Sequence, residues 1–127
     1  MVKTTKEPTA AELAILEQLW EHGPSSVKTL SQSLYGASTP SDIATVQKLL
    51  SRLEAKKHVE RDRNEWPHLF HAVVAREELI NQRLQTTADE LCDGTMSSLL
   101  NHLVGSKKFT STQRDHLRKL LDELDAQ

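Results

Sequence analysis

The chain has 127 residues, 37% of them hydrophobic, and a net charge of −2, which fits one small domain or two very small ones. Its 19 leucines, against three isoleucines, seven valines and five aromatic residues, favour helices and argue against a β-sandwich or a doubly wound sheet. A single cysteine excludes an internal disulfide, and no apolar run approaches the ~18 residues of a membrane span, so we expect a soluble cytoplasmic protein.

The first helix is expected to start after a frayed tail of about eight residues. Thr9 and Glu12 have the spacing of a capping box, in which each side chain accepts a hydrogen bond from a backbone N–H at the start of the helix. Leucines at helical spacing follow, and Gly23-Pro24 ends the helix after His22.

Two more helices are predicted before residue 58. A short one follows Ser25 or Ser26 and ends at Gly36. The next begins at Ser41 or Asp42, and its apolar residues recur every three or four positions, as a helix with one buried face requires: Ile43, Val46, Leu49, Leu50 and Leu53.

The spacing of the apolar residues no longer fits a helix after Lys57. Two short runs, 58–63 and 68–74, flank a turn at 64–67, which is typical of a β-hairpin. Three helices followed by a hairpin is the order of a winged helix-turn-helix, in which the third helix enters the major groove and the hairpin, or wing, contacts the backbone or minor groove. We therefore predict a mainly α protein with a winged-helix DNA-binding domain over residues 1–75.

Residues 76–127 predict a second, helical domain. Its three leucine-rich helices comprise only 52 residues, too few to close a core easily by themselves. We expect them to pair with a second copy of the chain and form a homodimer; the alternative is packing back onto the winged helix. The expected dimerisation residues are Leu79, Leu84, Leu91, Leu99, Leu103, Leu117, Leu121 and Leu124.

The outer face of the third helix carries side chains suited to double-stranded DNA. They can hydrogen-bond to base edges and phosphates: Thr45, Gln47, Lys48, Ser51 and Arg52. Residues 1–74 have no net charge, but the window 48–63 holds six cationic and three acidic residues, a net charge of +3. Arg61 and Arg63 of the wing lie in this window, and we expect them to contact DNA as well.

A near-neutral N-terminal half leaves a second function open, that of a winged-helix adaptor that binds proteins and does not read DNA. Neither a catalytic motif nor a glycine-rich phosphate loop is present, so we predict no enzyme activity and no cofactor. His68 and His71 are three residues apart on an expected strand and face opposite sides, so no metal site is predicted.

Trp66 stands at the expected tip of the wing. We expect it to pack against Pro67 or the base of the wing. The alternative is a wedge at the edge of a DNA groove.

An ordered series of segments resembles the penicillinase repressor family, which includes the methicillin-resistance and copper-responsive repressors. The series spans residues 9–124 and consists of Glu12-Leu13 with Leu19-Trp20-Glu21-His22-Gly23-Pro24, Thr45–Leu53, Val74–Glu78, and Asp93-Gly94-Thr95 with the leucines that follow. The resemblance implies a dimeric transcriptional repressor of a palindromic operator, with base-reading and phosphate-binding roles for the polar residues of the third helix.

The chain departs from this family at four places, one of which is Ala44, where a threonine is common and would offer one more contact. Some members are cleaved by a sensor-linked protease between an asparagine and an aromatic residue, whereas the matching pair here is His102-Leu103, so the resemblance gives weak support to such a partner. Lys57 stands where the family usually has a helix-ending glycine. The cysteine-rich C-terminal motif of the copper-responsive members is missing, which argues against copper sensing through thiolates.

Overall fold

The computed structural model describes residues 7–105 and 109–125, and the chain divides into two compact units, Met1–Ile80 and Asn81–Gln127. The division lies inside helix α4 (Arg76–Leu91), at residue 80 rather than at the residue 75 expected from the sequence. The reason is that Leu79, in the first turn of α4, packs in the core of the first unit.

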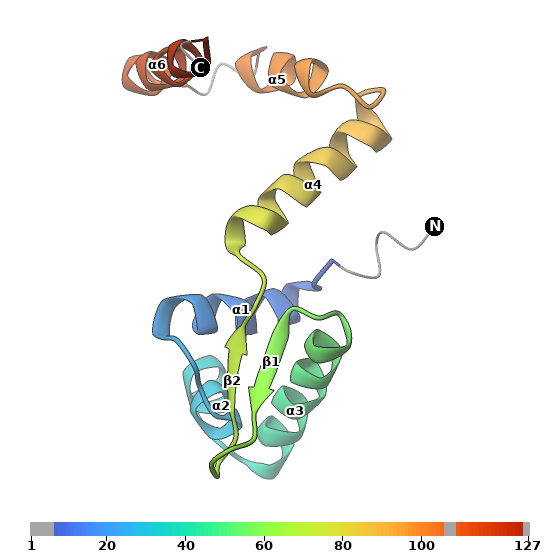
Figure 1. Ribbon diagram of the computed structural model, residues 1–127, viewed down its shortest axis with the longest axis vertical. Helices are drawn as coiled ribbons and strands as arrows, with labels where there is room; N and C mark the ends of the chain where they lie inside the picture. The colour runs from blue at the N-terminus through green and yellow to red at the C-terminus, as the bar shows by residue number, and fades with distance from the viewer. Residues whose placement is uncertain (1–6, 106–108, 126–127) are drawn as a thin grey trace. The chain divides into compact units, whose positions relative to one another are not determined.

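The first unit contains three helices and a hairpin, in the order α1 (Ala10–His22), α2 (Val27–Tyr35), α3 (Pro40–Ala55), β1 (Val59–Asp62) and β2 (Leu69–Ala72). Figure 1 shows the hairpin running alongside α3, with α1 across one end. This is the winged helix-turn-helix predicted from the sequence, and we call it the winged-helix unit.

Side-chain caps fix the starts of the three helices. The predicted capping box is confirmed: Glu12 N–H donates to Thr9 Oγ1 at 3.2 Å, and Thr9 N–H donates to Glu12 Oε1 at 3.0 Å. Ser26 caps α2 by accepting a hydrogen bond from the Thr29 N–H.

The start of α3 differs from the prediction of Ser41 or Asp42. The cap is Thr39, whose hydroxyl accepts a hydrogen bond from the Asp42 N–H at 3.1 Å. Pro40 then occupies the first turn, where its fixed φ suits a helix and its missing N–H leaves no donor unpaired.

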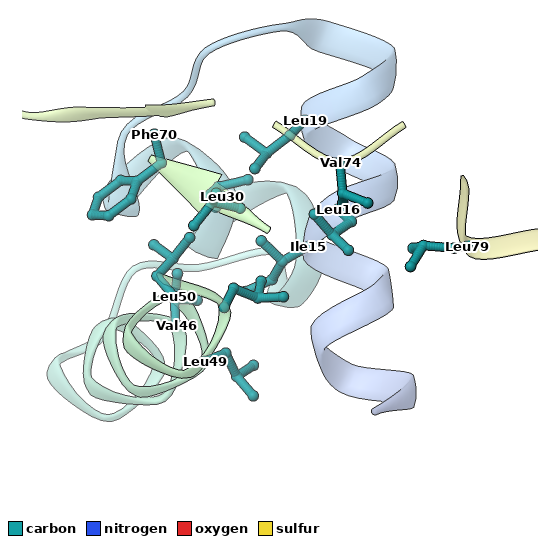
Figure 2. Packing of buried hydrophobic residues seen from close by; sticks show 12 residues of the cluster. Ile15, Leu16, Leu19, Leu30, Val46, Leu49, Leu50, Phe70, Val74 and Leu79 are labelled. Atoms are coloured by element: carbon teal, nitrogen blue, oxygen red, sulfur yellow. The ribbon is translucent and has the colours of Figure 1, made fainter. Parts of the chain in front are cut away.

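The core of the winged-helix unit lies between the three helices and the hairpin. Ile15 and Leu16 of α1, Leu30 of α2 and Leu50 of α3 are all at most 1% exposed. Figure 2 shows these side chains converging, with Phe70 of β2 beside them and Leu79 next to α1. The apolar stripe of α3 is therefore buried, and its opposite face points to solvent.

The two strands of the hairpin pair with each other, and the segment between α1 and α2 pairs with β2. The hairpin strands pair antiparallel, from Val59 opposite Ala72 to Asp62 opposite Leu69. Ser25 extends the pairing, because its N–H donates to the Phe70 carbonyl at 3.0 Å and its carbonyl accepts from the Phe70 N–H at 2.8 Å. The segment between α1 and α2 thus holds β2 in place.

Lys57 lies between α3 and β1 in the left-handed conformation, with φ of 64°. A side chain there costs about 1 kcal/mol relative to a right-handed conformation. The backbone therefore adopts at Lys57 the conformation that a glycine allows most easily.

The second unit has α5 (Met96–Gly105) and α6 (Ser111–Asp125) after the remainder of α4. Neither α5 nor α6 contains a buried residue among those described. The exposed apolar side chains of these three helices include Leu84, Leu91, Leu100, Leu103, Val104, Leu120, Leu121 and Leu124. No described helix has the length and apolar character needed to cross a membrane.

A buried ion pair joins α1 to the end of α3. Glu12 is 1% exposed, and its carboxylate accepts a hydrogen bond from Lys56 Nζ. Burial by itself would raise the pKa of Glu12, but the hydrogen bonds from Lys56 and Thr9, with the positive charges of Lys56 and Arg52, outweigh it and lower the pKa below its usual value.

We predict that Glu12→Gln lowers the free energy of unfolding by about 2 kcal/mol at pH 7, because a charged hydrogen bond is lost. Since the folded-state pKa of Glu12 is depressed, its contribution is present above the pKa of the unfolded state and disappears as the pH falls through the folded-state pKa. Urea unfolding at several pH values should show the difference between wild type and variant shrinking in acid. Exposed Glu21→Gln is the control, and a difference independent of pH would contradict this account.

Candidate nucleic-acid interface

The outer face of α3 presents all five polar residues that the sequence predicted for DNA contact. Helical spacing places them away from the buried stripe of Val46, Leu50 and Leu53, and each is exposed: Thr45, Gln47, Lys48, Ser51 and Arg52. No described part of the winged-helix unit covers them. This face is free to lie against a large, flat or grooved partner.

Two flanks of that face have different surroundings. Gln47 and Ser51 border a hollow between α3 and the wing. On the other flank, Arg52 lies near enough to α1 for its charge to lower the pKa of Glu12. The Thr45 hydroxyl donates to the Ser41 carbonyl at 3.0 Å, which leaves the oxygen of that hydroxyl free to accept a hydrogen bond.

The hollow has a volume of about 670 Å³, and we call it the α3–wing groove. Its walls come from the first turns of α2, one side of α3, and the wing. The lining residues are Ser26, Val27, Lys28, Thr29, Gln32, Ile43, Gln47, Ser51, Arg61, Trp66, Pro67, His68 and Phe70. The groove therefore joins the start of α2 to two of the predicted base-reading residues.

Arg61 occupies a different position from the other predicted DNA-contact residues. Its guanidinium forms an ion pair with Glu54 of α3 at 3.0 Å, and its Cζ lies 4.8 Å from the centre of the Phe70 ring. The Arg61 side chain is only 28% exposed, and its Nε is buried with no hydrogen-bond partner. These contacts fasten the wing to α3.

The remaining cations of the 48–63 window face solvent. Lys56 and Arg61 are paired with Glu12 and Glu54, as described above. Among the residues that the structure describes, the other four form no ion pair and are exposed: Lys48, Arg52, Lys57 and Arg63. The positive charge available to an anionic partner thus lies on the outer face of α3, at its end and on the wing.

Trp66 is not packed as the sequence led us to expect. Its side chain is 84% exposed, and its one ring contact is with His68, edge-on at 4.8 Å between ring centres. The turn around it is tied by the Asn64 N–H, which donates to Asp62 Oδ1. The loop between β1 and β2 is six residues long. Trp66 lies in this loop, beyond the paired strands and away from the core.

The wing leads directly into an anchored first turn of α4. The indole N–H of Trp20 donates to the Val74 carbonyl at 2.9 Å, and the Arg76 guanidinium lies 4.7 Å from the centre of the Trp20 ring. Arg76 also faces Glu17 of α1 at 3.8 Å. Together with buried Leu79, these contacts fix the start of α4 on the winged-helix unit.

Sequence reasoning missed the α2 side of the interface. Lys28, Thr29 and Gln32 are exposed and line the α3–wing groove opposite the wing. The signal was present, because the first helix of a helix-turn-helix pair, here α2, crosses the DNA backbone. Across residues 7–105 and 109–125, no three His, Cys, Asp or Glu side chains gather in a way that would hold a metal ion.

Comparisons with known proteins find a family model and a solved structure that are similar to this chain. The family model of the penicillinase repressor matches residues 8–123. A solved structure, that of a MarR family protein from Bacillus stearothermophilus, is similar with 21% sequence identity and a TM-score of 0.48, covering 93% of this chain and 73% of that one. Comparison with curated proteins finds no match.

A winged helix with an exposed, cationic third helix is the arrangement found in DNA-binding transcriptional regulators. Because the family model covers nearly the whole chain, the protein belongs to the penicillinase repressor family. The fold and the family predicted from the sequence are therefore confirmed.

The contacts of Arg61 lead to a prediction about stability. Arg61→Ala removes a half-buried ion pair and the packing on Phe70, so it should lower the free energy of unfolding by about 1–2 kcal/mol. Exposed Arg63→Ala, the matched control, should change it by less than about 0.5 kcal/mol. Urea denaturation followed by circular dichroism measures both, and equal effects would contradict the anchoring role of Arg61.

Proposed function

We propose that the protein is a homodimeric repressor that binds a palindromic DNA operator, with one α3 helix of each protomer in the major groove. The observation that carries the proposal is the outer face of α3, where two unpaired cations lie among three side chains able to hydrogen-bond to bases. Lys48 and Arg52 supply charge, and Gln47 and Ser51 supply donors and acceptors.

The wing and the start of α2 support phosphate contacts on either side of α3. Arg63 and Lys57 are exposed cations near the wing, and Lys28 is one on α2. Cations at such positions neutralise phosphates and release counterions, which makes binding depend steeply on salt. For Arg61 we propose a positioning role, because its charge is already paired with Glu54.

The second unit supports a dimer through what it leaves exposed. Leu91 is 80% exposed, Leu103 48%, Leu121 45% and Leu124 65%, and neither α5 nor α6 contains a buried residue. Apolar surface on this scale marks an interaction site. Members of the family are typically dimeric, and a second copy of the same unit would cover these leucines in both chains.

Leu79 is set apart from the other leucines of the predicted dimer surface. It is 6% exposed and packs in the winged-helix core, so we leave it out of the proposed interface. Leu99 and Leu117 are half-buried, and Leu84 is 38% exposed. We propose that the dimer surface consists of these three with Leu91, Leu103, Leu121 and Leu124.

Induction by proteolysis would require cleavage at His102-Leu103, which lies inside α5 with both side chains exposed. A protease needs an extended substrate backbone, so α5 would have to unwind first. We propose that release from the operator does not proceed by cleavage at this bond, because it carries neither the asparagine nor the aromatic residue of the family's cleaved sequence.

We predict that Lys48→Ala and Arg52→Ala each weaken operator binding by about 1–3 kcal/mol if the side chain contacts a base, and reduce the salt dependence by about one counterion if it contacts a phosphate. The operator is first obtained by selection from random duplexes. Fluorescence anisotropy at several salt concentrations then measures both quantities. Unchanged binding by both variants would contradict the assignment of the α3 face.

Lys119→Ala is the matched control for this measurement. It removes the same charge from an exposed position on α6, on the side away from the leucine stripe of that helix. It should leave both affinity and salt dependence unchanged. An equal loss in the control would show that only the total charge matters.

We predict that Leu121→Glu converts the dimer to a monomer at micromolar concentration, because it places a charge in an apolar interface. Sedimentation velocity measures the change. Lys119→Glu places a glutamate on the opposite side of α6, with a larger change in net charge, and should remain dimeric. A wild-type protein that sediments as a monomer would refute the proposed dimer.

A further inference from the structure

The tip of the wing carries an unusually exposed apolar group. Trp66 is 84% exposed, whereas the other exposed large apolar residues described in the winged-helix unit range from 37% for Leu69 to 48% for Ile80. An indole in water forgoes the favourable free energy of burial. The His68 ring contacts the indole at 4.8 Å between ring centres, with the two ring planes at 75° to each other.

The position of Trp66 identifies what would cover it. It lines the α3–wing groove together with Gln47 and Ser51 of α3, and Lys28 stands on the opposite wall. Exposed Arg63 is three residues away on the same wing. A partner seated on α3 therefore passes the indole, and the cations on either side favour an anionic one.

We propose that Trp66 contacts the operator duplex, with its ring packed against the sugars at the edge of the minor groove beside the α3 contact. This inference rests on the proposed DNA-binding function and adds an apolar contact to it. Proteins that bind the minor groove use apolar side chains too, which they insert between base steps.

An apolar contact with sugars differs from the α3 contacts in two measurable respects. Sugars carry no sequence information, so the contact should strengthen binding to operator and to random duplex equally. An indole displaces no counterion, so its loss should leave the salt dependence unchanged, whereas loss of Lys48 should reduce it by about one ion if Lys48 meets a phosphate.

The affinity test compares Trp66→Ala and Trp66→Phe with wild type. Dye-labelled duplexes of about 30 base pairs, one holding the selected operator and one of random sequence, report binding by anisotropy. Trp66→Ala should weaken binding to both about tenfold at each salt concentration, and Trp66→Phe should recover most of the loss. Because the side chain is exposed, both variants should keep wild-type circular dichroism.

Intrinsic fluorescence supplies an independent readout. The chain has two tryptophans, and the Trp20 indole N–H is bonded to the Val74 carbonyl within the winged-helix unit. Adding unlabelled duplex should shift the emission of wild type to shorter wavelength as Trp66 leaves water. The Trp66→Phe variant, which retains only Trp20, should show no shift.

The outcomes separate this inference from the function on which it rests. If the labelled duplexes bind wild type but Trp66→Ala binds equally tightly, or if only operator binding is weakened, the Trp66 contact is refuted and DNA binding stands. An emission unchanged by bound duplex would also refute it. If neither duplex binds wild type, the proposed function fails and this contact fails with it.

Discussion

Burial of one face of α3 is the constraint on which the rest of the structure depends. Val46, Leu50 and Leu53 are fully buried, and α3 packs against α1, α2 and β1, so the rotation of α3 about its axis is fixed. Because one face of α3 is buried, the residues on its opposite face must point to solvent, among them Lys48 and Ser51. The surface proposed to read DNA is thus a direct consequence of how the core is packed.

The wing turns this exposed helix into a grooved surface. The ion pair between Arg61 and Glu54 and the backbone pairing of Phe70 with Ser25 hold the hairpin beside α3. Uneven placement of charge explains how residues 1–74, with no net charge, can suit an anionic partner. The window 48–63 has a net charge of +3, and four of its cations are exposed and form no ion pair among the described residues: Lys48, Arg52, Lys57 and Arg63.

Most of the fold was predictable because its signals are local: the capping box at Thr9, the glycines that end α1 and α2, and the leucine period of α3. The predictions that were wrong concerned features that depend on longer-range contacts or on competition between neighbouring residues. Thr39 capped α3 in place of Ser41 because proline follows it. Helical spacing placed Leu79 on an apolar stripe but could not show which unit buries it. The ion pair of Arg61 with Glu54 joins a strand to a helix, so the sequence pattern of either element alone could not predict it.

The central claim is that two copies of the chain present two α3 helices to one operator, and selection of bound duplexes from a random library tests it most directly. The account predicts an enriched inverted repeat whose half-sites lie about one helical turn, or a whole number of turns, apart. Failure to enrich any sequence, or enrichment of a single half-site with no symmetric partner, would contradict it.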